Sequence, residues 1–344
     1  MEPFTHAFAS LALAHAGERR LPRFGTTMLI VSGLAPDLDY ASYFAGPGAF
    51  LRFHRTALHS ATGAALTACV IAGAFCALDK KLPARKIAQK KTFAPLTFGA
   101  AAATCAIGAA GHIVLDLASG VGVQLLWPFH ARWSAWDLAT NFDLWILLLL
   151  IAGLLLPLLF RLVNEEVGDR KKGRGGGRAA IVTLLLMAAF LGARANLHSR
   201  AIDLLLSREY HGRIPLEAGA FPASSTPFGW RGVVVTDNTD EVVEVPLGPG
   251  DEFDPNGSPT RYKPEDSPAL DAGQKTASAE RFLKYARFPF ASVERIEDGY
   301  RVEVHDLRFA SNDIEPANIF VRVDLNSSLQ VQSEEFRYAS SPNP

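Results

Sequence analysis

The stretch Phe53-His54-Arg55-Thr56-Ala57-Leu58-His59-Ser60 stands directly before an apolar run that extends from Ala61 to Leu78. The run is long enough to cross a bilayer, because about 20 helical residues span the hydrocarbon core. Imidazole and guanidinium groups are costly at the mouth of such a helix and usually mark a functional site. The stretch therefore predicts a membrane helix with a polar site at its N-terminal end.

The chain divides sharply by composition. It has 344 residues and a net charge of −1, and its mean hydropathy is +0.12. Residues 1–198 are rich in Ala, Leu, Ile, Val and Phe, whereas residues 199–344 are polar with alternating valines. We predict an α-helical polytopic membrane domain of about six helices over 1–198 and a small β-rich (α+β) soluble domain over 199–344. The near-neutral charge gives no support to nucleic-acid binding.

Six apolar runs account for the predicted helices: Phe4–Ala16, Thr26–Phe44, Ala61–Leu78, Phe93–Leu117, Leu144–Leu162 and Ala179–Leu197. The second run is broken at Ala35-Pro36-Asp37-Leu38-Asp39, because proline disfavours helical geometry in the residue before it. In the soluble part, alternating segments predict strands at 231–235, 241–245, 301–304 and 319–323, and a helix is expected at 278–286. The three cysteines lie in apolar runs, so neither a disulfide framework nor a Cys-based zinc site is expected.

Basic residues predict the orientation. They cluster at 19–23, 80–91 and 170–178, and successive crossings place these clusters on one side of the membrane. By the positive-inside rule this side is the cytoplasm. The N-terminus and the C-terminal domain are then extracytoplasmic. The chain start lacks the basic region of a cleavable signal peptide, so no removed signal is expected.

Ionisable side chains from several segments should meet at the outer face. Counting 19 positions from Leu78 back to His59, or from Phe93 on to His112, gives roughly 28 Å, which is about one bilayer core. Both histidines should therefore lie at the same outer interface, beside Asp143 at the start of the fifth run. His6 and the Asp37–Asp39 break fall on the same side by this topology.

Two pairs of these residues have the spacing of metal ligands. His112 and Asp116 are four apart on a helix and share one face, so they could bind one divalent metal or form a buried pair that rigidifies the bundle. In an extended segment Asp37 and Asp39 would both face inward and suit a two-metal site. The alternative is that Asp37 caps a helix and Asp39 is solvated.

His54 and His59 are five apart and could reach one cavity. Arg55 offers a cation for a phosphate or carboxylate, or alternatively an anchor to lipid head groups.

An ordered set of motifs carries a family resemblance: Thr5-His6, Ala35-Pro36-Asp37-Leu38-Asp39, His54-Arg55-X3-His59-Ser60, Gly111-His112-X3-Asp116 and Asn141-Phe142-Asp143. Together they resemble the YdjM-type (LexA-binding, inner-membrane-associated) family of metal-dependent hydrolases over most of the first 200 residues. Pro227-Phe228-Gly229-Trp230-Arg231 and Arg287-Phe288-Pro289-Phe290 resemble the soluble tail of longer members. The resemblance implies a hydrolase and leaves the substrate open.

We therefore expect a membrane-bound metal-dependent hydrolase with one or two divalent ions, most simply zinc. The expected ligands are His6, Asp37, Asp39, His54, His59, His112 and Asp116. A metal-activated water would attack an ester or phosphoester of a lipid-like or envelope substrate that enters from the bilayer. Asp39 or Asp143 would accept its proton, and Arg55 would stabilise the developing negative charge.

The alternative is a non-catalytic membrane protein in which a structural metal or a polar network ties the helices together while the soluble domain binds a partner. Eight candidate ligands, counting Asp143 with the seven named above, exceed the needs of one closed four-coordinate zinc, which favours catalysis. A transporter would need polar residues near mid-membrane, whereas these lie at one end.

Overall fold

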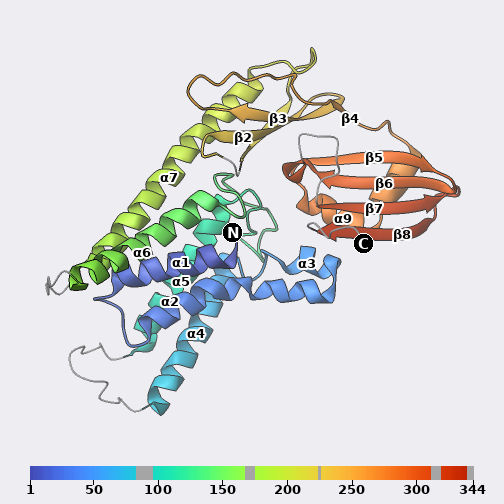
Figure 1. The fold of residues 1–344 in the computed structure, drawn as a ribbon. Coiled ribbons are helices and arrows are strands. Elements are labelled where there is room, and N and C mark those ends of the chain that lie inside the picture. The colour runs from blue at the N-terminus through green and yellow to red at the C-terminus, as the bar shows by residue number, and fades with distance from the viewer. Residues whose placement is uncertain (83–95, 167–174, 224–225, 311–318, 339–344) are drawn as a thin grey trace. The chain divides into compact units, whose positions relative to one another are not determined.

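In a computed structural model the described residues are 1–82, 96–166, 175–223, 226–310 and 319–338. They form two compact units: Met1–Asp39 with Arg55–Ala195, and Tyr40–His54 with Asn196–Pro344 (Figure 1). The inserted segment 40–54 thus belongs to the same unit as the C-terminal part. The predicted boundary between 198 and 199 stays a prediction.

The apolar half of the chain is helical, as predicted. Its elements are α1 (Pro3–Gly17), α2 (Gly25–Leu34), the 3-10 helix η1 (Ala35–Ala45), α4 (Ala61–Lys81), α5 (Phe98–Ala118), α6 (Leu144–Glu166) and α7 (Gly175–Leu206). The proline break is confirmed, because α2 ends at Leu34 and the chain continues as η1. The basic loops predicted at 80–91 and 170–178 fall mainly outside the described residues.

Three helices of the described chain are long and apolar enough to cross a membrane: Ala61–Lys81, Phe98–Ala118 and Gly176–Leu206. The apolar part of α6, Leu144–Phe160, is shorter. Helices α1 and α2 have 15 and 10 residues, below the roughly 20 that a full crossing needs. Six apolar helices therefore form among the described residues, and three of them are both long and apolar enough for a span.

Glycines let α2 pack closely against α5 and α1. A Cβ atom at Gly108 of α5 would overlap the Ser32 side chain of α2 and lie 2.6 Å from the Leu29 carbonyl oxygen, and one at Gly33 of α2 would overlap the Ser10 side chain of α1. Small residues at such crossings allow the backbones of membrane helices to touch. This contact sets the distance between α2 and the end of α5 that carries His112 and Asp116.

The second unit contains two four-stranded antiparallel sheets. One has the order β1 (Glu217–Pro222), β2 (Gly229–Val235), β3 (Thr239–Pro246), β4 (Arg261–Tyr262), and the other β5 (Pro289–Ile296), β6 (Gly299–Asp306), β7 (Ile319–Asn326), β8 (Val331–Tyr338). The alternating segments predicted as strands lie in β2, β3, β6 and β7, so the β-rich class is confirmed. Valines 233, 242, 302, 304, 321 and 323 are buried because alternate strand residues face one side.

Helices complete this unit. They are α3 (Pro47–Phe53), α8 (Pro268–Gln274) and α9 (Ala277–Tyr285). The helix predicted at 278–286 is α9, whose Phe282 is buried.

The close crossing of α2 and α5 can be tested with a matched pair of glycine variants. Gly108→Leu should lower the midpoint of thermal unfolding of the detergent-solubilised protein, because overpacking a tight contact costs about 1–3 kcal/mol. Gly99→Leu on the same helix should change it little, since a Cβ there meets nothing within 4 Å. Equal midpoints for the two variants would contradict the close packing.

Candidate metal centre

Helix α5 presents His112 and Asp116 on one face, one turn apart. Nδ1 of His112 lies 2.7 Å from the Gly33 carbonyl oxygen, so this nitrogen donates its proton and Nε2 carries the lone pair. Nε2 of His112 lies 3.3 Å from Asp116 Oδ2. The glycine-mediated approach of α2 thus fixes the tautomer and the direction of the ring.

His59 is held just before α4. Ser60 caps that helix, and its hydroxyl accepts a hydrogen bond from the Gly63 amide at 2.9 Å. Nδ1 of His59 lies 3.0 Å from Asp39 Oδ2, and the same carboxylate oxygen accepts a hydrogen bond from the Arg55 amide at 2.8 Å. Asp39 therefore stands behind His59 and directs the Nε2 atom of its ring away from itself.

Three potential ligand atoms meet at one point. The Nε2 atoms of His59 and His112 are 3.0 Å apart, and Asp116 Oδ2 lies 3.1 Å from the first and 3.3 Å from the second. When both Nδ1 atoms carry protons, two imidazole lone pairs and a carboxylate oxygen converge, an arrangement that suits a cation between them. A tetrahedral ion with bonds of about 2.0–2.1 Å separates its ligands by about 3.3–3.4 Å, close to these distances.

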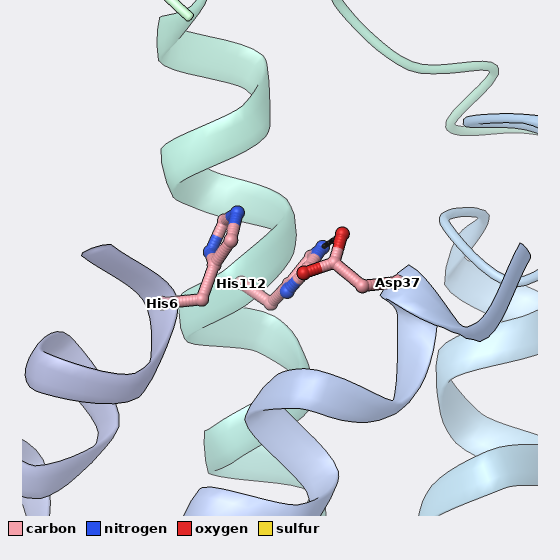
Figure 2. Close-up of side chains that lie close together, drawn as sticks. All are labelled: His6, Asp37 and His112. Atoms are coloured by element: carbon pink, nitrogen blue, oxygen red, sulfur yellow. Dashed lines mark ion pairs between the residues drawn. The ribbon is translucent and has the colours of Figure 1, made fainter. Parts of the chain in front are cut away.

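His6 and Asp37 border the same point from α1 and η1 (Figure 2). The ring of His6 stacks on that of His112 with centroids 3.7 Å apart, and its Nε2 lies 3.4 Å from Asp116 Oδ1. Asp37 Oδ1 is 3.7 Å from His112 Nε2 and 3.9 Å from His59 Nε2. Two buried groups could thus hold a metal ion: His59, His112 and Asp116, and His6, Asp37 and His112.

The donor set fits a divalent metal. Within the described residues both ring nitrogens of His6 and Oδ2 of Asp37 are buried without a hydrogen-bond partner, and such buried polar atoms are costly unless something binds them. His6, His59, His112 and Asp116 are each at most 2% exposed. Imidazole nitrogens with carboxylate oxygens are the donors that zinc and other transition metals accept.

Arg55 lies behind Asp116 and braces it. The residue is 1% exposed, and its backbone has a φ of 57°. The guanidinium lies 3.3 Å from Asp116 Oδ1 and donates to Ser119 Oγ at 2.9 Å and to Asn141 Oδ1 at 3.0 Å. These contacts orient Asp116 and tie the end of α5 to the loop that follows it.

Two predicted site residues lie in other surroundings. Asp143 pairs with Arg194 of α7 at 2.5 Å and accepts a hydrogen bond from the Ile146 amide at the start of α6. The ring of His54 packs against Phe50 and Tyr40, with centroids 4.4 Å and 4.5 Å away. Neither residue, nor Asp39, belongs to the two groups of potential ligands found among the described residues.

Sequence reasoning missed several supporting groups. The Gly33 carbonyl, the Ser119 hydroxyl and the Asn141 amide hold His112 and Arg55, and the Met1 amino group contacts Asp116 Oδ1. A backbone carbonyl carries no sequence signal. Asn141 had one, since it belongs to the Asn141-Phe142-Asp143 motif, although its partner could not be read from spacing.

The helical part of the chain matches a known protein family. The family model described as YdjM inner membrane protein matches residues 1–201, more than half of the chain and all of the residues that meet at the site. Neither a curated protein nor a solved structure matches the chain at a significant level. The site residues and the apolar helices lie within the matched segment, and the chain belongs to the YdjM inner membrane protein family.

Proposed function

We propose that the protein is a membrane-bound metal-dependent hydrolase whose metal, zinc in the simplest case, is held by His59, His112 and Asp116. One observation carries the proposal: the Nε2 atoms of the two histidines face each other at 3.0 Å beside Asp116 Oδ2, while Asp39 and the Gly33 carbonyl engage their other nitrogens. Histidine ligands of metals are typically held in this way by a carboxylate or backbone carbonyl.

The number of ligands favours catalysis over a closed structural site. Catalytic zinc sites commonly have three protein ligands and an open position, whereas structural sites are filled by four. His6 and Asp37 border the trio and could complete a second position, so one or two ions can be accommodated. A metal bound there would supply Lewis acidity and activate a water molecule.

Asp37 is the carboxylate best placed to accept the proton of the attacking water. Asp39 contacts His59 and the Arg55 amide, and Asp143 pairs with Arg194, so both candidates from the sequence are engaged elsewhere. Asp37 Oδ2 is buried and makes no hydrogen bond within the described chain. In the proposed reaction the water oxygen bonds to the acyl carbon or phosphorus, Asp37 accepts its proton, the ester bond breaks and the leaving oxygen takes the proton back.

An ester or phosphoester of a lipid-like or envelope molecule suits the surroundings. The loop after α5 exposes Leu126, Trp127, Phe129, Trp136 and Phe142, and aromatic rings favour the membrane interface. This loop joins the site directly, because Arg55 donates to Asn141 within it. A substrate that partitions into the interface would therefore reach the site without leaving the membrane.

The runner-up is a non-catalytic polar network. The contact of Asp116 with Arg55 favours it, because this cation neutralises the carboxylate without a metal.

Metal content separates the two proposals. Detergent-purified wild type, after repletion with zinc and removal of the excess, should retain at least one divalent ion per chain by elemental analysis. His112→Ala combined with Asp116→Ala should retain none, whereas His130→Ala, which changes an exposed histidine, should match wild type. If the wild-type protein retained no metal, the hydrolase proposal would be wrong and the cluster would serve as a polar network between the helices.

The position of Asp39 predicts an indirect role. Asp39→Asn should weaken metal binding by about 10- to 100-fold, as loss of a group that orients a ligand histidine does, and should not abolish it. Affinity is measured by competition with a chelator of known strength. The matched control is Asp79→Asn, which removes a carboxylate paired with Arg23 at 2.6 Å. Unchanged affinity in Asp39→Asn would show that His59 is held without it.

Orientation is proposed from charge alone: the N-terminus and the C-terminal unit are extracytoplasmic in the inner membrane. A reporter enzyme that is active only outside the cytoplasm, fused after Pro344, should be active. The same reporter inserted at residue 85, in the basic loop, should be silent. The reverse pattern would invert the topology and place the site at the cytoplasmic face.

A further inference from the structure

A groove of about 450 Å³ lies in the second unit between the end of α7 and the turn that follows β3. Arg200 near the end of α7 and Arg208 just after it line the groove. Asp251 and Glu252 of the turn line it as well. Both signs of charge therefore line one cavity.

The floor of the groove is apolar. Leu204, Leu247 and Phe253 line it, and all three pack against the buried cluster around Leu205 and Trp230. Because this cluster is buried between the helix and the sheet, the floor is a fixed surface. An apolar floor below charged walls suits a ligand with a polar head and a hydrocarbon part.

The charged groups of the groove remain available. Within the part of the chain that the structure describes, Arg200, Arg208 and Glu252 form no ion pair. Asp251 is fixed in its turn, since its Oδ2 accepts a hydrogen bond from the Gly248 amide at 3.0 Å. The groove therefore presents cations and anions that have not neutralised each other.

Helix α7 places the groove near the membrane surface. The helix is continuous from Gly175 to Leu206, and its apolar stretch ends near Leu197. Arg200 lies about 4.5 Å further along the axis, within a head-group layer that is about 5–8 Å thick on each side of the bilayer. Arg208 lies two residues beyond Leu206, where the helix ends. Lipid head groups are among the ligands present at this depth.

We propose that this groove binds the head group of a phospholipid that carries both a phosphate and a primary ammonium, as phosphatidylethanolamine does. Arg200 and Arg208 bind the phosphate, because guanidinium groups form paired hydrogen bonds with phosphate oxygens. Glu252 and Asp251 accept hydrogen bonds from the ammonium. Leu204, Leu247 and Phe253 contact the glycerol and the first methylenes. The site does not depend on the proposed hydrolase activity.

Native mass spectrometry of the full chain in detergent tests the proposal. The protein is titrated with an equimolar mixture of phosphatidylethanolamine, phosphatidylglycerol and phosphatidylcholine with identical acyl chains. Wild type should retain the ethanolamine lipid preferentially. Arg200→Ala with Arg208→Ala should lower its retention at least about tenfold, as expected when a charged hydrogen-bond partner is lost. Glu252→Gln should reduce the preference over phosphatidylglycerol.

Controls separate this site from general lipid binding. Arg295→Ala, which removes an exposed arginine of β5, should behave as wild type, and the arginine double variant should keep the metal content of wild type. Equal retention of the three lipids by wild type would overturn the proposal. Unchanged retention in the arginine double variant, or displacement of the lipid by equimolar inorganic phosphate, would overturn it as well.

Discussion

The centre of the helical unit depends on one electrostatic constraint. Two imidazole nitrogens and a carboxylate oxygen lie within 3.0–3.3 Å of one another in a buried place, where unpaired polar atoms are expensive. Three arrangements outside the trio enforce this: Asp39 behind His59, the Gly33 carbonyl behind His112 and the Arg55 guanidinium behind Asp116. The supporting groups come from different segments, so the trio forms only when the helices have packed.

The packing of the helices therefore also determines the geometry of the site. Gly108 lets α2 approach α5 until the Gly33 carbonyl reaches His112. A larger residue at Gly108 would separate the two helices and remove that hydrogen bond without touching any ligand. The buried Arg194–Asp143 pair likewise connects α7 to the start of α6. Charged residues inside the helical unit thus serve both the site and the assembly of the helices.

Sequence reasoning recovered the elements better than the roles of individual residues. The proline break predicted that Asp37 and Asp39 would both leave regular helix geometry, and η1 bears this out. The expectation for an extended segment is that both carboxylates face inward and suit a two-metal site. In η1, Asp37 borders the imidazoles directly while Asp39 lies behind His59. The depth argument predicts the correct end of the helix for Asp143. Its partner Arg194, however, is 51 residues away, and no local sequence pattern indicates that the two would pair.

The sequence by itself determined the division into an apolar helical part and a β-rich part, because hydrophobic periodicity and alternation are local properties of the chain. It also indicated five of the ionisable side chains that meet, His6, Asp37, His59, His112 and Asp116, since helix length converts position into depth, but it added His54 and Asp143, which lie elsewhere. Only the tertiary structure decided which of them are potential ligands and which hold those ligands. That distinction depends on the distances between side chains of α1, α2, α5 and the segments beside them. Residue spacing along one chain does not encode these distances.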